Sequence, residues 1–279
     1  MKYTTVTTLK MVVGLSWVLG WGGLTGCSVH NPASPAAVTP APKSFRVMSY
    51  NIHHGEGMDG KVDLQRIADL IQAEGADLVA LQEVDKGTQR TDRRDLGAEL
   101  AALTGMTCVF SNNFHYQGGE YGNAVLSRFP VKRWTNRHFQ MLKPAEPRGL
   151  LQVVVDLPGG EMVFMSTHLD FSGDGVNRWS SVGEIEAVLP QYAGLPVILC
   201  GDFNDVPTSR VYRRLSETFD DTWVRAGAGD GFTIAANRPN KRIDYIWVSR
   251  NAPFTPVKAW VPSSLASDHL PVIAEFQFH

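Results

Sequence analysis

The spacing of hydrophobic residues along the chain predicts short strands that outnumber helices. Apolar residues alternate with polar ones, or form short continuous runs, in segments typical of strands. These segments are 45–52, 77–84, 107–111, 121–128, 150–157, 161–168, 196–199, 242–248 and 272–278. Apolar residues three and four apart predict helices over 63–73, 96–103, 179–192 and 209–215. Because many strands are joined by short turns, the pattern favours an α+β fold with two packed, mixed or mainly antiparallel sheets and outer helices.

One predicted strand end carries residues suited to binding ions. The apolar run 197–200 ends at Gly201, and Asp202 and Asn204 follow before a helix that Ser209 could cap. Residues two apart in an extended segment point the same way. A carboxylate and an amide there can bind a hard cation, a water or a phosphate oxygen. An Asx turn that caps the next helix is the alternative interpretation.

Polar residues recur where other predicted strands begin or end. Loops at strand ends are where sites are built on a rigid scaffold. Taken singly, each residue also fits an ordinary role as a turn residue, a surface acid or a hydrogen-bonded histidine. The full set is Asn51, Glu83, His168, Asp202, Asn204, Asp244, Asp268 and His269.

The N-terminal segment predicts export. Lys2 and Lys10 precede an apolar run over 11–24 that is too short for a transmembrane helix, which is the plan of a secretory signal. The run ends in Leu-Thr-Gly-Cys at 24–27, which resembles the lipobox of a bacterial lipoprotein and implies cleavage before Cys27 and lipidation of its thiol. An ordinary signal with a chance cysteine is the alternative. With Ser28 after the cysteine, we expect an anchor in the outer membrane of a Gram-negative cell.

The domain organisation follows from composition. Residues 1–26 form the predicted signal, 27–44 a tether rich in Pro and Ala, and 45–279 one domain large enough for a substantial core. Removal of the signal leaves 24 basic against 28 acidic side chains, a formal charge of −4. This charge gives no support for a broad surface that grips duplex DNA, although a local basic cleft remains compatible with it. Cys108 and Cys200 lie in apolar runs and are expected to be buried thiols.

Seven short motifs, taken together in order, resemble the endonuclease/exonuclease/phosphatase superfamily with the DNase I-like fold. Gly-Asp-Phe-Asn and Ser-Asp-His are the most telling, and the set covers nearly all of 45–279. The motifs are Ser-Tyr-Asn-Ile at 49–52, Leu-Gln-Glu-Val at 81–84, Gly-Asn-Ala-Val-Leu-Ser-Arg at 122–128, Ser-Thr-His-Leu at 166–169, Gly-Asp-Phe-Asn at 201–204, Arg-Ile-Asp-Tyr-Ile at 242–246 and Ser-Asp-His-Leu-Pro at 267–271. The resemblance implies a four-layer α/β/β/α sandwich of two mixed sheets flanked by helices.

The resemblance also implies metal-dependent hydrolysis of a phosphoester with Mg²⁺ or Mn²⁺, whose hard-ion chemistry suits carboxylate and amide oxygens. Glu83 is implied as the main metal ligand, with Asn51 and Asp268 beside it. Asp202 and Asn204 are implied to orient or deprotonate the attacking water, or to hold a second ion. His269, held by Asp244, and His168 are implied as donors to the phosphate. One-ion and two-ion versions both fit these residues.

Two further residues are weaker candidates for substrate binding. Arg148 precedes a predicted strand and could reach a phosphate, or could be an ordinary surface arginine. Asn123 could shape the site through its turn, or only make that turn.

The substrate is predicted only by class. The family acts on nucleic acids, sphingomyelin, inositol phosphates and others, and we expect the choice to lie in loops 53–60, 114–119, 171–178 and 227–240. Phe171 and Trp179 could contact a base or a lipid, or could simply pack. The acidic charge and the predicted anchor favour a monomer acting on a phospholipid head group or another small phosphodiester at the cell envelope.

Three other functions stay open at this stage. An extracellular nuclease acting on DNA or RNA would use the same core residues. A non-catalytic surface lipoprotein could bind a phosphorylated ligand. A serine hydrolase that uses His269 and Asp244 is disfavoured, because the chain has no Gly-x-Ser-x-Gly motif.

Overall fold

The computed structural model describes residues 43–279. The predicted signal, Cys27 and nearly all of the predicted tether lie outside this range. The described chain begins its first strand at Ser44, one residue before the predicted start of the domain. Within residues 43–279, none of the helices has the length and apolar character needed to cross a membrane.

Two six-stranded sheets form the centre of the domain. The first has the strand order β11-β12-β1-β2-β4-β3, and the second β5-β6-β7-β8-β10-β9. The strands are β1 (Ser44–Asn51), β2 (Leu78–Lys86), β3 (Thr107–Tyr116), β4 (Gly119–Ser127), β5 (Val131–His138), β6 (Gly149–Leu157), β7 (Gly160–His168), β8 (Val197–Asp202), β9 (Phe219–Asp221), β10 (Asp244–Ser249), β11 (Phe254–Trp260) and β12 (Val272–Phe278). β1 pairs with β2 in parallel, and β7 with β8, whereas the other neighbours are antiparallel. Both sheets are therefore mixed.

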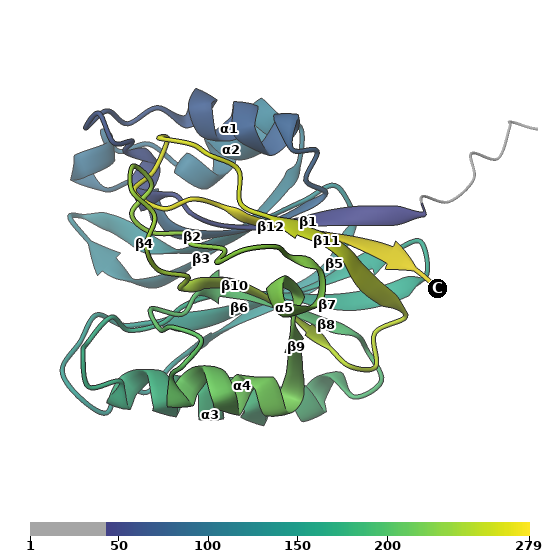
Figure 1. Cartoon of the computed structure of the whole chain (residues 1–279). Coiled ribbons are helices and arrows are strands. Elements are labelled where there is room, and N and C mark those ends of the chain that lie inside the picture. The colour runs from purple at the N-terminus through teal and green to yellow at the C-terminus, as the bar shows by residue number, and fades with distance from the viewer. Residues whose placement is uncertain (1–42) are drawn as a thin grey trace, which may run out of the picture. The chain divides into compact units, whose positions relative to one another are not determined.

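Helices cover the outer face of each sheet (Figure 1). The pair α1 and α2 packs on the first sheet, and α3 and α4 pack on the second. The helices are α1 (Leu64–Ala73), α2 (Leu96–Thr104), α3 (Val176–Val188), α4 (Arg210–Thr218) and α5 (Thr222–Ala226), with short 3-10 turns η1 (His53–Gly55), η2 (Gln89–Thr91) and η3 (Leu189–Tyr192). This arrangement confirms the predicted α+β fold with four layers.

Three apolar clusters hold the layers together because each sheet is apolar on both faces. The central cluster joins the inner faces of the sheets and includes Phe45, Phe164 and Phe276. The other two clusters lie under the helices. In α1, for example, Leu64, Ile67, Ala68 and Ile71 form one buried stripe.

The polar residues that start the helices behave as the sequence predicts. Asp63 accepts a hydrogen bond from the Gln65 backbone N–H at 3.0 Å and begins α1. Ser209 accepts one from the Tyr212 backbone N–H at 3.0 Å and begins α4. These caps satisfy backbone donors that a helix start otherwise leaves free.

Several elements differ from the prediction. Strands β5, β9 and β11 and helix α5 were not predicted, and α3 begins at Val176 rather than at residue 179. β5 is an edge strand with mostly exposed side chains, and β11 is an edge strand that contains Pro256, so neither shows the alternation of a half-buried strand.

The predicted loop 114–119 is largely a hairpin between β3 and β4. Its two-residue turn, Gln117–Gly118, has positive φ angles of 47° and 75°. Positive φ at both central residues is typical of tight hairpin turns.

Cys108 and Cys200 are both free thiols. Cys200 is fully buried and Cys108 is partly buried. Burial raises the pKa of the Cys108 thiol to about 12 and that of Cys200 well above its usual value. Both thiols are thus expected to be unreactive at neutral pH.

Strand pairing brings the predicted polar residues to one end of the sheets. In the first sheet, Asn51 lies opposite Gln82, next to Glu83. In the second sheet, His168 and Asp244 both lie opposite Asp202, from β7 and β10 respectively. Parallel pairing aligns the carboxyl ends of β7 and β8, and antiparallel pairing adds the start of β10.

Candidate functional site

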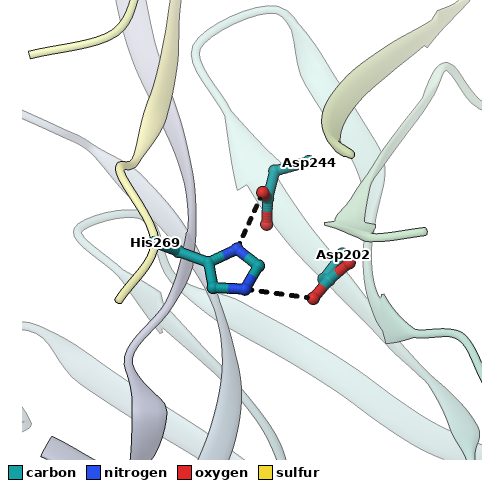
Figure 2. A group of neighbouring side chains, drawn as sticks. All are labelled: Asp202, Asp244 and His269. Carbon is teal, nitrogen blue, oxygen red and sulfur yellow. Dashed lines mark hydrogen bonds and ion pairs between the residues drawn. The ribbon is translucent and has the colours of Figure 1, made fainter. Parts of the chain in front are cut away.

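His269 forms a buried ion pair with Asp244 at this end of the sheets (Figure 2). Its Nδ1 lies 2.9 Å from Asp244 Oδ2, and its Nε2 lies 3.7 Å from Asp202 Oδ2. The Thr233 hydroxyl donates to the same Asp244 oxygen at 2.5 Å. Burial alone would lower the pKa of His269, but the charges of Asp244 and Asp202 raise it to about 10. His269 is therefore an imidazolium at neutral pH that presents Nε2–H toward Asp202.

His168 lies on the other side of Asp202 and has the opposite kind of partner. Its Nδ1 lies 2.9 Å from Arg148 Nη1, and its Nε2 lies 3.5 Å from Asp202 Oδ2. Because a guanidinium can only donate, Nδ1 accepts this hydrogen bond and Nε2 carries the proton of a neutral ring. Burial, and then the charge of Arg148, lower the pKa of His168 well below its usual value. His168 is thus a neutral donor.

Asp202 lies between the two imidazoles and is itself fully buried. Its Oδ2 accepts a hydrogen bond from Asn51 Nδ2 at 3.1 Å, and its Oδ1 accepts one from the Asn204 backbone N–H at 2.8 Å. Burial, followed by the charge of Asp244, raises the pKa of Asp202 to about 7, and His269 opposes this rise. A carboxyl that titrates near neutrality can take up or release a proton under physiological conditions.

Asn204 has a positive φ of 49°. Asn adopts this left-handed conformation more readily than most residues. The conformation closes the turn after β8, and the side chain donates to the Leu169 carbonyl at 3.0 Å. The Asn204 amide nitrogen lies 3.1 Å from His168 Nε2, and because Nε2 carries the ring proton this close contact joins two donors and is not a hydrogen bond. The Asx turn of the alternative interpretation is present, because Asp202 Oδ1 accepts from the Asn204 backbone N–H, but Ser209 caps α4, and the turn carries a side chain that belongs to the site.

Glu83 lies where the pairing of β2 with β4 is interrupted. Its φ is 60°, and the register shifts between Leu81 and Val84. A bulge of this kind redirects a side chain, here away from the continuous strand. Glu83 Oε1 accepts a hydrogen bond from Asn51 Nδ2 at 3.0 Å. The same amide nitrogen of Asn51 thus links Glu83 in the first sheet to Asp202 in the second.

Asp268 lies beside the end of β1, at the rim of the site. The Ser267 hydroxyl donates to the Asn51 carbonyl at 2.8 Å, which holds this loop against β1. Asp268 Oδ1 is 4.0 Å from His53 Nδ1. The structure therefore brings Asp268 near Asn51, but it does not place Asp268 on the wall of the cavity described below.

The donor set fits a hard cation. Within residues 43–279, no lysine, arginine or histidine nitrogen lies within 4 Å of the Glu83 carboxylate. Asn51 presents its amide nitrogen to Glu83, and its Oδ1 accepts a hydrogen bond from the His53 backbone N–H at 3.0 Å, so this amide would have to turn to offer its oxygen to an ion beside Glu83. Carboxylate and amide oxygens are what Mg²⁺ and Mn²⁺ prefer.

A second group could also hold a metal ion, since oxygen or nitrogen atoms of Asp202, Asp244 and His269 all lie within 4.8 Å of one another. An ion there would have to displace the hydrogen bonds that Asp244 Oδ2 accepts from His269 and Thr233. An ion on the Glu83 side would have to displace the hydrogen bond from Asn51 Nδ2 to Glu83 Oε1, but it would leave the pair of His269 with Asp244 intact.

A cavity of about 310 Å³ opens over these residues. Its floor contains His168, Asp202, Asn204 and His269. Its walls are formed mainly by aromatic and charged residues, namely Glu83, Arg90, Phe114, Tyr116, Tyr121, Glu146, Arg148 and Phe171. Asn51 and Asp244 lie behind the floor and contact the residues that line it.

The sequence analysis missed three residues of the wall, namely Arg90, Tyr121 and Glu146. None of them stood out as a candidate, because each reaches the cavity only after the β3–β4 hairpin and the loop before β6 have folded. Of the four loops expected to select the substrate, 171–178 and the hairpin at 114–119 line the cavity. Loop 53–60 does not line it, and neither does loop 227–240, whose Thr233 instead supports Asp244.

The two weaker candidates are placed differently from one another. Arg148 is only 2% exposed and contacts both His168 and Glu146, with 2.7 Å between its Nη1 and Glu146 Oε1. The alternative of an ordinary surface arginine is therefore wrong. Asn123 is buried on β4 and donates to the Gly149 carbonyl across the sheets at 3.2 Å, so it supports the strand after Arg148 and does not line the cavity.

Comparisons with known proteins agree with this geometry. The sequence model of the Endonuclease/Exonuclease/phosphatase family matches residues 48–269. YbhP, an uncharacterized protein of Escherichia coli (strain K12), is 30% identical over 251 residues, which cover 83% of this chain and 96% of YbhP.

Solved structures show the same fold. An endonuclease/exonuclease/phosphatase from Beutenbergia cavernae DSM 12333 is 30% identical with a TM-score of 0.70, covering 85% of this chain and 72% of that chain. A mannosyl-6-phosphatase from Bacteroides thetaiotaomicron VPI-5482 is 22% identical with a TM-score of 0.72, covering 84% of this chain and 100% of that chain. The family match includes every predicted site residue of the folded domain, and we conclude that this chain belongs to the endonuclease/exonuclease/phosphatase family, whose members hydrolyse phosphoester bonds.

Proposed function

We propose that this protein hydrolyses a small phosphoester, with a phosphodiester favoured, and that it needs Mg²⁺ or Mn²⁺. One observation carries the proposal. One charged and one neutral imidazole face the same carboxylate, Asp202. The Asn51 amide links Asp202 to Glu83, whose carboxylate has no cationic partner among the described residues. This arrangement supplies donors, a proton acceptor and a cation position within one cavity.

Glu83, Asn51 and Asp268 would hold the first ion, and Asp202 and Asn204 could hold a second. A bound divalent ion would neutralise charge on the phosphoryl oxygens as the bond to phosphorus breaks. The chain's own residues do the remaining work on water and phosphate.

Asp202 is suited to accept a proton from the attacking water, because its pKa of about 7 matches working pH. His269 donates from Nε2 to a phosphoryl oxygen, and Asp244 keeps that imidazole charged. His168 donates from Nε2 as a neutral group, and Arg148 holds its orientation. Positioned donors of this kind stabilise charge that develops in the transition state.

The size and charge of the cavity favour a compact substrate. A volume of about 310 Å³ accommodates a small molecule or head group rather than a long polymer segment. The chain carries a formal charge of −2, which gives no help in gripping nucleic acid. A mannosyl-6-phosphatase of the same fold makes phosphomonoesters worth testing beside diesters.

The location at the cell envelope is also part of the proposal. Lipidation of Cys27 would anchor the domain, through the predicted tether, to the outer membrane, next to phospholipid and other envelope phosphoesters. Metabolic labelling with palmitate tests it. Labelled protein in the membrane fraction of wild type, and none in Cys27→Ser, is the expected result.

A substrate panel tests the activity. Sphingomyelin, phosphoinositides, small diesters, sugar monophosphates, DNA and RNA are each incubated with the protein, with and without EDTA. We expect turnover of a small phosphoester that EDTA abolishes and that Glu83→Ala lacks. Turnover of DNA or RNA alone would assign a nuclease instead, and binding without turnover under any divalent ion would assign a ligand-binding lipoprotein.

A further inference from the structure

Arg90 is held on the cavity wall with one edge of its guanidinium group unused. Its Nε and Nη2 donate to the two carboxylate oxygens of Asp85 at 2.6 and 2.8 Å. Asp85 is fully buried, and the Thr88 hydroxyl also donates to it at 2.6 Å. Within residues 43–279, Arg90 Nη1 has no hydrogen-bond partner, although Arg90 lines the cavity.

Aromatic rings fix the face of the same guanidinium. The Arg90 guanidinium carbon lies 5.0 Å from the ring centroid of Tyr116 and 5.5 Å from that of Tyr121. The Arg90 backbone N–H donates to Gln117 Oε1 at 2.9 Å. The group is thus preorganised, because two N–H donors and the ring face are already committed and only the Nη1 edge is free.

The wall that carries Arg90 is closely packed. Gly119, at the start of β4, lies so close to Gly87 that a Cβ added to it would be 2.3 Å from the Gly87 carbonyl carbon. Arg93 Nη1 donates to the Gly87 and Gln117 carbonyls at 3.0 and 3.1 Å. The hairpin tip and the segment after β2 therefore form one unit, and Arg90 does not depend on a loose loop.

The other cations of the cavity already have assigned partners. Arg148 contacts His168 and Glu146, and His269 contacts Asp244. A buried arginine–carboxylate pair contributes little net stability compared with apolar packing, so stability alone is a weak reason for the pair of Arg90 with Asp85. A guanidinium with an open edge, in a cavity for which we propose phosphate binding, is suited to anion recognition.

We propose that Arg90 binds a second anionic group of the substrate, a phosphate or a carboxylate, so that the substrate is a small phosphoester with at least one further anionic group. This inference rests on the proposed function for the scissile phosphate. It adds a specificity residue that none of the predicted strand-end motifs contains.

Non-hydrolysable ligands test the inference without requiring turnover. Propane-1,3-diphosphonate, together with its shorter and longer homologues, is titrated into the full chain by calorimetry with Mg²⁺ present. Propylphosphonate is the ligand with a single anionic group. We expect one of the diphosphonates to bind at least about ten-fold more tightly than propylphosphonate, since a charge-assisted hydrogen bond is worth a factor of that order.

Variants then assign the preference to Arg90. Arg90→Lys keeps the charge beside Asp85 but lacks the free Nη1 edge of the guanidinium. The preference for the diphosphonate over propylphosphonate should therefore fall by about ten-fold. Arg133→Ala, on the exposed strand β5, is the matched arginine control and should keep the full preference. If Arg90→Lys does not fold, the neutral pair Asp85→Asn with Arg90→Gln replaces it.

The outcomes separate this inference from the proposed function. Equal binding of diphosphonates and propylphosphonate would overturn the role of Arg90 even in an active enzyme. A preference for the diphosphonate that survives in the folded Arg90 variant would do the same. A preference that depends on Arg90 in a protein without turnover would support the anion site and remove the proposed hydrolysis.

Discussion

The two imidazoles on the cavity floor have Nδ1 partners of opposite charge. His168 and His269 are both buried, and their Nε2 atoms lie 3.5 and 3.7 Å from the same oxygen of Asp202. The Nδ1 partner is Arg148 in one case and Asp244 in the other. Burial lowers the pKa of both rings. The charge of Arg148 lowers the pKa of His168 further, whereas the charges of Asp244 and Asp202 outweigh burial and raise the pKa of His269 to about 10.

The comparison teaches that residue type alone does not assign a role in this site. A histidine motif predicts two phosphate donors, but the groups behind the rings make one a cation and the other a neutral donor. The cation can stabilise added negative charge on a phosphoryl oxygen, whereas the neutral ring can orient an oxygen without adding charge. The following changes separate these roles.

Removal of the charged imidazole should have the largest effect. We expect His269→Ala to lower kcat by about 10³-fold or more, since it removes a donor and a charge that act on the reacting group. Steady-state rates on the substrate found in the panel measure this. His279→Ala, at an exposed histidine after β12, is the matched control and should leave kcat unchanged. Equal rates for wild type and His269→Ala would show that this imidazole takes no part.

Neutralising the partner of His269 should have the next largest effect. Asp244→Asn removes the charge that holds the pKa of His269 near 10, so the imidazolium should lose its proton at lower pH, and kcat should fall by about 10²-fold. NMR titration of the metal-free protein follows the ring. Wild-type His269 should stay protonated at pH 8, where the ring of the variant should be losing its charge. A ring that is neutral at pH 8 in the wild type would contradict this assignment.

Changing the partner of His168 should have a smaller effect on kcat. The pKa of His168 should rise, whereas that of His269 falls in Asp244→Asn. Arg148→Met removes a positive charge that lowers the pKa of His168, so that pKa should rise, and kcat should fall by about 10-fold. The variant also leaves Glu146 without its ion pair, so Arg148→Met with Glu146→Gln is the compensated control. An unchanged NMR titration of His168 in both variants would exclude Arg148 as the group that sets its state.

The smallest expected effect on activity comes from a change in β8, the strand that ends at Asp202. Gly201 lies between β7 and β10, and a Cβ there would be 2.2 Å from the Thr167 carbonyl oxygen. Gly201→Ala should lower the free energy of unfolding by about 1–3 kcal/mol through overpacking, with a lesser loss of activity. Gly173→Ala, where no atom lies within 4 Å of the added Cβ, is the control. Denaturant unfolding measures both, and equal stabilities would contradict the close packing described here.

The residues of the cavity floor could be predicted from sequence, because each lies within a few residues of a strand that the local pattern of apolar residues reveals. Asp202 and Asn204 follow an apolar strand within a few residues, and His269 and Asp244 sit at comparable strand boundaries. Strand pairing then needs only the order of the sheets to bring them together. The protonation states of these residues were harder to predict, since the raised pKa of Asp202, for example, depends on burial that no motif shows.

Three residues of the wall, Arg90, Tyr121 and Glu146, could not be predicted, because they meet only through the tertiary structure. Arg90 lies in a polar segment with several other arginines and reaches Tyr116 by way of the hairpin turn at 117–118. Strand β5 had no alternation to reveal it, because its side chains are mostly exposed at the edge of the sheet. These residues of the cavity wall thus left less trace in the sequence than the residues of the floor.

One measurement tests the central proposal most directly: ³¹P NMR of the reaction in water enriched in ¹⁸O, with Mg²⁺, on the substrate that the panel identifies. Attack of water at phosphorus predicts one ¹⁸O atom in the phosphate product of the wild type, and no product in EDTA or in His269→Ala. Product without ¹⁸O, or labelled product at the wild-type rate in His269→Ala, would contradict hydrolysis at this site.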